Sequence, residues 1–110
     1  MSGRHSRNKG LAFERDCVKL FKQAMPGEDI KRGLQSRGGG AEVPDVDMPV
    51  FHIECKVGKK PNIRAAYEQA SRDTQGKIPV AIVKDDRKEP LVVMGLTDYM
   101  NLIAEWWEGE

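Results

Sequence analysis

The residues with the clearest chemical potential are Asp45, Glu54 and Lys56, two carboxylates and one ammonium. Residues 50–57 have the pattern of a strand, in which alternate side chains point to opposite faces. Glu54 and Lys56 therefore share one face, about 6.5–7 Å apart along the strand, while the alternate face is apolar. We expect Asp45, on a short preceding strand, to lie across from Glu54 if the two strands form a hairpin.

Two carboxylates that converge on one point bind a hard divalent cation through oxygen, and Mg²⁺ uses few protein ligands and several waters. A lysine beside them can orient a metal-bound water and offset negative charge that develops on a phosphate. An ordinary surface Glu–Lys pair is the alternative. The Pro44–Asp45 step upstream and the apolar alternate face favour the metal site, with Mg²⁺ or Mn²⁺ as the cation.

Glu14 is a second unusual carboxylate, because it interrupts the apolar stripe of the first expected helix, which contains Leu11, Val18, Phe21 and Met25. A carboxylate on a core-facing stripe costs several kcal/mol unless it is paired or metal-bound. Two interpretations are open. Glu14 lies at the border of the stripe and pairs with Lys9 or Arg15, or it reaches the same cation as Asp45 and Glu54.

The rest of the pattern predicts elements that could position these residues. Apolar periodicity, proline and glycine predict helices at 10–25, 61–75 and 98–107 and strands at 28–35, 44–47, 50–57, 78–84 and 91–96. Pro61 is expected at the first helical position, Gly76 just after that helix, and Thr97 as the cap of the last helix. The order α-β-β-β-α-β-β-α predicts an α/β fold with one mixed sheet flanked by helices.

Composition limits the classes of function. The 110 residues fit one domain, 10–110, preceded by a flexible basic arm, 1–9. Residues 1–40 hold nine Lys/Arg against four Asp/Glu, which favours a polyanionic partner. The sequence predicts no membrane span and no secretory signal. Cys17 and Cys55 are expected as reduced thiols in a cytoplasmic protein, and two isolated histidines argue against zinc.

The chain resembles the PD-(D/E)xK nucleases, because Pro44-Asp45 is followed by Glu54-x-Lys56. Within that superfamily it is similar to the archaeal-type Holliday junction resolvases. The similarity lies in the Lys9-Gly10 step ahead of a helix that bears Glu14-Arg15, and in the serine- and glycine-rich segment 36–40. The resemblance covers roughly residues 7–84 and implies a restriction-endonuclease-like core.

The resemblance implies a Mg²⁺-dependent endonuclease that hydrolyses phosphodiester bonds of branched DNA in recombination or repair, in a prokaryote or a virus. Glu14, Asp45 and Glu54 would hold the metal with the backbone carbonyl of Cys55, and Lys56 would position the water. We expect DNA contacts from basic and loop residues, with recognition of DNA shape rather than sequence. These residues are Arg4, Arg7, Lys9, Arg15, Arg32, Ser36, Arg37, Lys59 and Lys60.

Other functions and roles remain open at this stage. The first alternative is a nuclease of the virus-type replication-repair or restriction-like kind, which cuts flaps or duplex DNA. The second alternative is a non-catalytic nucleic-acid-binding protein. Gln69 is either a helix-surface residue or an accessory site residue, and His52 is either exposed or in contact with phosphate. Trp106-Trp107 either caps the core or forms a subunit contact. We expect a homodimer, because a four-way junction has two symmetric strands to cut, and no organic cofactor.

Overall fold

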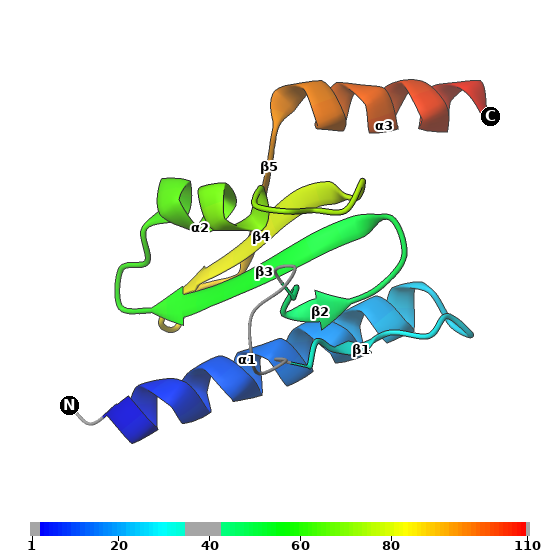
Figure 1. Cartoon of the computed structure of the whole chain (residues 1–110). Coiled ribbons are helices and arrows are strands. Elements are labelled where there is room, and N and C mark those ends of the chain that lie inside the picture. The colour runs from blue at the N-terminus through cyan, green and yellow to red at the C-terminus, as the bar shows by residue number, and fades with distance from the viewer. Residues whose placement is uncertain (1–2, 35–42, 110) are drawn as a thin grey trace.

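The computed structural model describes residues 3–34 and 43–109. The elements along the chain are α1 (Gly3–Ala24), β1 (Lys31–Arg32), β2 (Val46–Asp47), β3 (Phe51–Gly58), α2 (Ile63–Ala70), β4 (Ile78–Asp85), β5 (Leu91–Met94) and α3 (Leu96–Glu108). Their order and types confirm the expected α/β succession, and Figure 1 shows α1 and α2 on opposite faces of the sheet.

One mixed sheet with the strand order β1-β2-β3-β4-β5 forms the centre of the fold. β3 and β4 are parallel, as the α2 crossover between them requires, and the other neighbours are antiparallel. α1 packs against β1, β2 and β3, and α2 packs against β3, β4 and β5. The first three strands and α1 therefore frame the candidate site.

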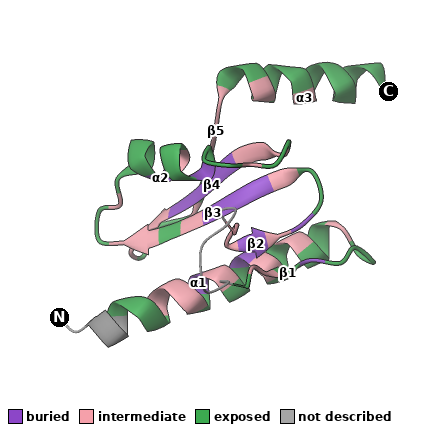
Figure 2. Cartoon of the chain, in the orientation of Figure 1, coloured by how far each residue is buried: buried purple, intermediate pink, exposed green. Residues whose placement is uncertain are grey.

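Two hydrophobic clusters lie on the two faces of the sheet. The larger one joins Phe13 and Cys17 of α1 to Ile53 of β3 and to Val80 and Ile82 of β4. The smaller one joins Ala66 of α2 to Ala81 and Val83 of β4. β4 is thus buried on both faces, as its nearly continuous apolar run predicts, and Figure 2 shows this buried centre in β3 and β4.

α1 begins at Gly3 rather than at Gly10, so residues 3–9, which were expected as a flexible arm, are helical. Neither an apolar stripe nor helix propensity signals this extension, because Gly3, His5, Ser6 and Asn8 are weak helix formers. The extension is also tied to the body, because Lys9 Nζ donates to Asp86 Oδ2 at 3.0 Å.

α2 is shorter than the expected 61–75. Asn62, and not Pro61, forms its boundary, because the Asn62 side chain accepts a hydrogen bond from the Ala65 N–H at 2.9 Å. The helix ends at Ala70, and Asp73, Gln75 and Gly76 then adopt positive φ, which a helix cannot contain. Gly76 therefore belongs to a turn that lies beyond the helix end.

α3 begins after Gly95, so Thr97 lies inside the helix and is not its cap. Gly95 is extended, with φ −67° and ψ 144°, and its carbonyl accepts from the Tyr99 N–H at 3.0 Å. The site also favours glycine, because a Cβ there would come within 2.9 Å of the Tyr67 hydroxyl oxygen. The strand before α3, β5, ends at Met94 instead of Leu96.

The described helices include none that is both long enough and apolar enough to span a membrane.

Candidate functional site: an acidic pair at a bulge in the sheet

The pairing of β2 with β3 sets the position of Asp45. Val46 pairs with Ile53 and Asp47 pairs with His52 in the antiparallel ladder. The Asp45 N–H also donates to the Ile53 carbonyl, at 2.8 Å, which is one residue out of that register. Two residues of β2 therefore oppose one residue of β3, which is the arrangement of a β-bulge.

The bulge corrects the expected position of Asp45, which faces Ile53 instead of lying across from Glu54. Neighbouring residues of a bulge no longer alternate strictly between faces. Asp45 can therefore turn toward α1, and its Oδ2 accepts a hydrogen bond from the Cys55 N–H at 2.8 Å. This bond fixes the carboxylate against the middle of β3.

Glu14 is close enough to Asp45 for the two negative charges to interact. It lies on α1 with its side chain 18% exposed, and its Oε1 accepts from Arg32 Nε at 3.3 Å. The pKa of Glu14 is raised, first because burial removes water from the carboxylate and second because the negative charge of Asp45 is near. Arg32 and Arg15 lower the pKa without cancelling the rise. Burial and the charge of Asp45 therefore outweigh the effect of the Arg32 ion pair on Glu14.

The partner of Glu14 differs from both sequence-based suggestions. Arg15 contributes only a long-range charge effect, and Lys9 bonds to Asp86. Arg32 is the ion-pair partner of Glu14, because β1 lies antiparallel to β2 and packs beside α1. A contact between residues 14 and 32 depends on the tertiary fold, so helix spacing alone could not predict it.

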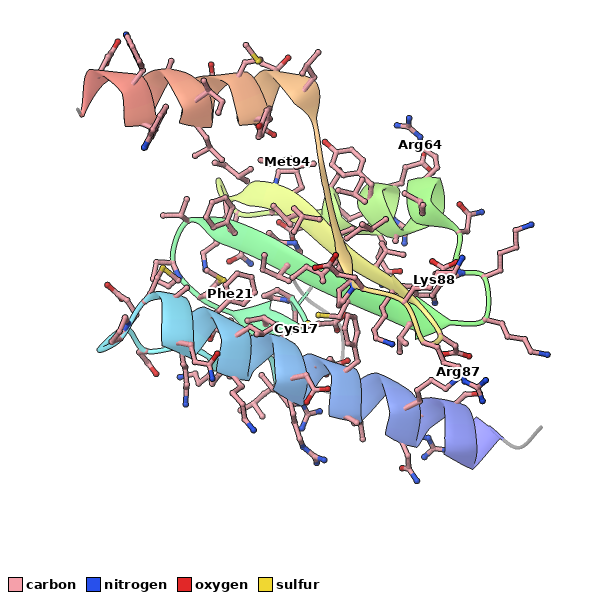
Figure 3. The ribbon with its side chains drawn as sticks, turned by 180° about the vertical axis from the view of Figure 1, so that it is seen from behind. Cys17, Phe21, Arg64, Arg87, Lys88 and Met94 are labelled. Carbon is pink, nitrogen blue, oxygen red and sulfur yellow. The ribbon has the colours of Figure 1, made fainter. Side chains whose placement is uncertain are left out.

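Two thiols lie beside the carboxylate pair. Cys17 on α1 lies beside Cys55 on β3 in the larger hydrophobic cluster, and both are free cysteines. The pKa of Cys55 is raised by its contact with Cys17, by burial and by the negative charges of Asp45 and Glu14. Cys55 is therefore protonated at neutral pH, whereas the contact with Cys55 lowers the pKa of Cys17. Figure 3 shows Cys17 on the side of α1 that faces the sheet.

Glu54 and Lys56 occupy the same face of β3, as alternation predicts, but in different surroundings. Glu54 is 6% exposed, and Lys56 is exposed. The face they share also carries His52, whose Nδ1 donates to the Ala70 carbonyl at the end of α2 at 3.0 Å. Strand alternation therefore puts Glu54 on the α2 side, whereas Glu14 and Asp45 meet on the α1 side.

Glu14, Asp45 and Glu54 therefore do not form a complete three-carboxylate metal site. In the described part of the chain, no three side chains of the His, Cys, Asp or Glu type form a group that could hold a metal ion. Mg²⁺ requires only one or two carboxylates when waters and phosphate oxygens complete its shell. The Glu14–Asp45 pair supplies two hard oxygen donors and an unbalanced negative charge, which suits such a cation.

A pocket of about 420 Å³ lies on the surface that β1, β2, the start of β3 and the turn before β4 share. We refer to it as the basic pocket, because Lys31, Arg32 and Lys77 line it together with Asp47 and His52. His52 is 2% exposed, and its Nε2 finds no hydrogen-bond partner among the described residues. Arg32 joins the basic pocket to Glu14.

The remaining candidate DNA contacts fall into three groups. Arg7, Arg15, Lys59 and Lys60 are exposed, and Lys9 is held in its ion pair with Asp86. Gln69 is exposed on α2, away from the acidic pair. Ser36 and Arg37 lie outside the described residues, and so does the side chain of Arg4.

The sequence reasoning missed Lys31 and Lys77 as possible anion contacts. Lys31 stands next to Arg32, which is a local basic signal. Lys77 lies far along the chain, and it reaches the pocket because the β4 strand that follows it runs parallel to β3. Its Nζ donates to the Met48 carbonyl at 2.7 Å and lies 3.9 Å from Asp47 Oδ1. This long-range contact has no signal in the local sequence.

Comparisons of the chain with protein-family models, with curated proteins and with solved structures give no match.

Proposed function

We propose that the protein is a metal-dependent endonuclease that cuts branched DNA in the manner of a Holliday junction resolvase, on a restriction-endonuclease-like core. The observation that carries this proposal is the position of Asp45 at the bulge of β2, where the Cys55 N–H holds its carboxylate, with Glu14 of α1 close enough for the charge of Asp45 to act on it. Their mutual repulsion and the raised pKa of Glu14 fit a pair that a divalent cation completes.

Each residue has a distinct role in this proposal. Asp45 is held by the Cys55 N–H, so one of its oxygens is fixed in direction and binds the cation together with Glu14. Mg²⁺ bound there would supply a Lewis acid and would make a bound water more acidic. The Cys55 carbonyl is a further oxygen donor on β3. Glu54 is a donor by the resemblance alone, because strand alternation puts its side chain on the other face of β3 from Glu14 and Asp45. Exposed Lys56 orients the attacking water and the phosphate by its charge.

Arg32 also has a role in this arrangement. Its Nε hydrogen bond to Glu14 restrains the carboxylate before a cation arrives. When a phosphate enters, the guanidinium group, which also lines the basic pocket, binds phosphate oxygens without moving far. Arg32 would thereby link substrate binding to the position of Glu14.

Cations on both sides of the acidic pair support a path for the DNA backbone. Lys31, Arg32 and Lys77 line the basic pocket near the start of β3, and Lys59 and Lys60 follow its end. β3 has eight residues, so these groups lie roughly 25 Å apart. A duplex arm of DNA could contact several phosphates over this length, and such contacts bind without reading sequence.

A homodimer would suit a junction substrate, because two copies related by a two-fold axis present two cutting sites to two symmetric strands. Residues 36–40 contribute to junction binding in this proposal, by resemblance alone. The competing activities are cleavage of flaps or duplex DNA on the same site and nucleic-acid binding without cleavage. A single set of substrates separates the three.

The test uses labelled four-way junction, flap and linear duplex with Mg²⁺ or with EDTA. Paired symmetric cuts in the junction alone, dependent on Mg²⁺, support the proposal. Equal cutting of flap or duplex supports the second activity, and binding without cutting supports the third. Asp45→Asn and Glu54→Gln are expected to abolish cleavage while binding persists, whereas Asp29→Asn, at a carboxylate with 86% side-chain exposure, is the matched control that stays active. Near wild-type cleavage by Asp45→Asn contradicts the site.

A further inference from the structure

α3 carries a long apolar stripe, of which the described chain half-buries only Leu102. At about 100° per residue, its seven large apolar side chains fall within roughly 160° of the helix circumference. Thr97, Asp98, Asn101, Glu105 and Glu108 occupy the opposite face. None of the α3 residues is buried, and Figure 2 shows the helix mainly as exposed or intermediate along its length.

The two largest apolar side chains of the stripe are mostly exposed. Trp106 is 61% exposed and Trp107 is 72% exposed, with their ring centroids 6.4 Å apart. Leu96, Tyr99, Met100 and Ile103 are also exposed, and Leu102 is the half-buried member at the edge of the stripe. The tryptophan pair does not cap the core of its own chain, which leaves a contact with another molecule.

An apolar groove on the same chain matches this helix. Two adjoining pockets of about 360 and 160 Å³ share Phe21, Ile82 and Val92 as lining residues. The groove continues from Leu20 and Pro90 at one end to Met94 and Leu102 at the other. Val92 is 67% exposed in it, because α1 packs mainly against β1, β2 and β3 and leaves β5 largely uncovered. Figure 3 shows Phe21 on the sheet-facing side of α1.

We propose that α3 of one copy docks into this groove of a second copy, and that the reciprocal contact closes a two-fold homodimer. Each chain offers both the helix and the groove, which is the self-complementarity that a two-fold interface requires. The six exposed side chains present on the order of 800 Å² per chain, the area that each partner buries in a specific complex. α3 carries three carboxylates and no Lys or Arg, so neither nucleic acid nor an anionic lipid surface suits it.

The dimer does not require the nuclease activity proposed above, and its test uses no nucleic acid. Sedimentation equilibrium of the wild-type protein is expected to show a monomer–dimer equilibrium. Trp106→Ala should raise the dimer dissociation constant roughly 30-fold or more. Ile103→Asp should also raise the dimer dissociation constant. Asn101→Asp is the matched control, because it places the same carboxylate on the polar face of α3 and should dimerise as the wild type does. Since α3 buries none of its residues in the monomer, circular dichroism of these variants should be unchanged.

The groove is tested by Val92→Asp, which should also give a monomer. A mixture of Ile103→Asp and Val92→Asp retains one intact helix–groove pair, so a heterodimer should form that is weaker than the wild-type dimer and stronger than either variant alone. Three results overturn the proposal: a wild-type monomer at all concentrations, a Val92→Asp dimer as tight as the wild type, or no heterodimer in the mixture. The second and third results would mean that α3 binds a surface other than the groove.

Discussion

At the scale of single residues, the chemistry of the site centres on a carboxylate whose surroundings disfavour its charge. Glu14 is largely buried, faces the charge of Asp45 and has Arg32 as its hydrogen-bonded partner. A half-buried acid pair with one guanidinium group contributes little to stability, because desolvation offsets much of the attraction. The arrangement is better explained as a site that gains stability when a further cation enters.

This explanation predicts stabilisation by metal. Mg²⁺ should raise the melting temperature of the wild type, because a ligand that binds only the folded state adds about 2.7 kcal/mol at about 100 times its dissociation constant. Glu14→Gln and Asp45→Asn should lose this effect, and Asp29→Asn should keep it, since Asp29 is paired at the surface. Scanning calorimetry with and without Mg²⁺ measures the shift. Equal shifts in all four proteins would exclude a metal between Glu14 and Asp45.

The raised pKa of Glu14 also predicts a pH dependence. The folded chain holds the Glu14 proton more tightly than the unfolded chain, whose pKa is near 4.5. Stability from this group is therefore present at low pH and falls as the pH rises from 4.5 through the folded pKa. Glu14→Gln should accordingly gain stability over the wild type at neutral pH, and the difference should shrink toward pH 4.5.

Urea denaturation at several pH values, without metal, measures this difference. Glu28→Gln, at an exposed carboxylate, is the control that should show no such trend. A Glu14→Gln difference that does not vary between neutral pH and pH 4.5 would mean that Glu14 is not perturbed as its burial implies.

At the scale of elements, the position of Asp45 depends on how closely β1 and β2 approach each other. The Gly33 N–H donates to the Asp45 carbonyl at 3.0 Å, and a Cβ at Gly33 would collide with the carbonyl of Pro44. Glycine therefore permits the contact that holds the bulge in place. The sequence placed Gly33 only within the expected strand 28–35, and its particular role becomes visible when β1 lies beside β2.

Gly33→Ala should therefore act on the site without touching a carboxylate. The added methyl group must displace Pro44 and Asp45, so we expect a loss of about 1–3 kcal/mol in the free energy of unfolding and weaker stabilisation by Mg²⁺. Gly10→Ala is the control, because nothing lies within 4 Å of a Cβ there and alanine favours the helix. Chemical denaturation and calorimetry give both quantities. A Gly33→Ala protein with wild-type stability and metal response would show that the bulge does not depend on this contact.

At the scale of the whole molecule, local patterns predicted the succession of elements, because the apolar periods of helices and strands can be recognised within short stretches of sequence. They placed β3 and β4 within about one residue of their observed bounds. They did not predict the bulge at Asp45, the Arg32 partner of Glu14 or the approach of Lys77 to the basic pocket. Each of these depends on strand register or on packing between distant segments, which no local period encodes. α3 was predicted as a helix, yet its lack of packing is a property of the tertiary structure alone.

The distribution of charge over the whole fold leads to a last prediction, which concerns salt. If the DNA backbone follows β3 from the basic pocket to Lys59 and Lys60, then each phosphate contact releases counterions, and log K falls with log salt by about 0.9 per contact. Lys77→Ala and Lys60→Ala lie at the two ends of this path, so each should lower the slope by about one. Lys22→Ala, at an exposed lysine in the last turn of α1, should leave it unchanged. Fluorescence anisotropy with a labelled junction in EDTA, over a salt series, measures the three slopes without cleavage. A slope lowered equally by all three would indicate a diffuse cationic surface rather than a path along β3.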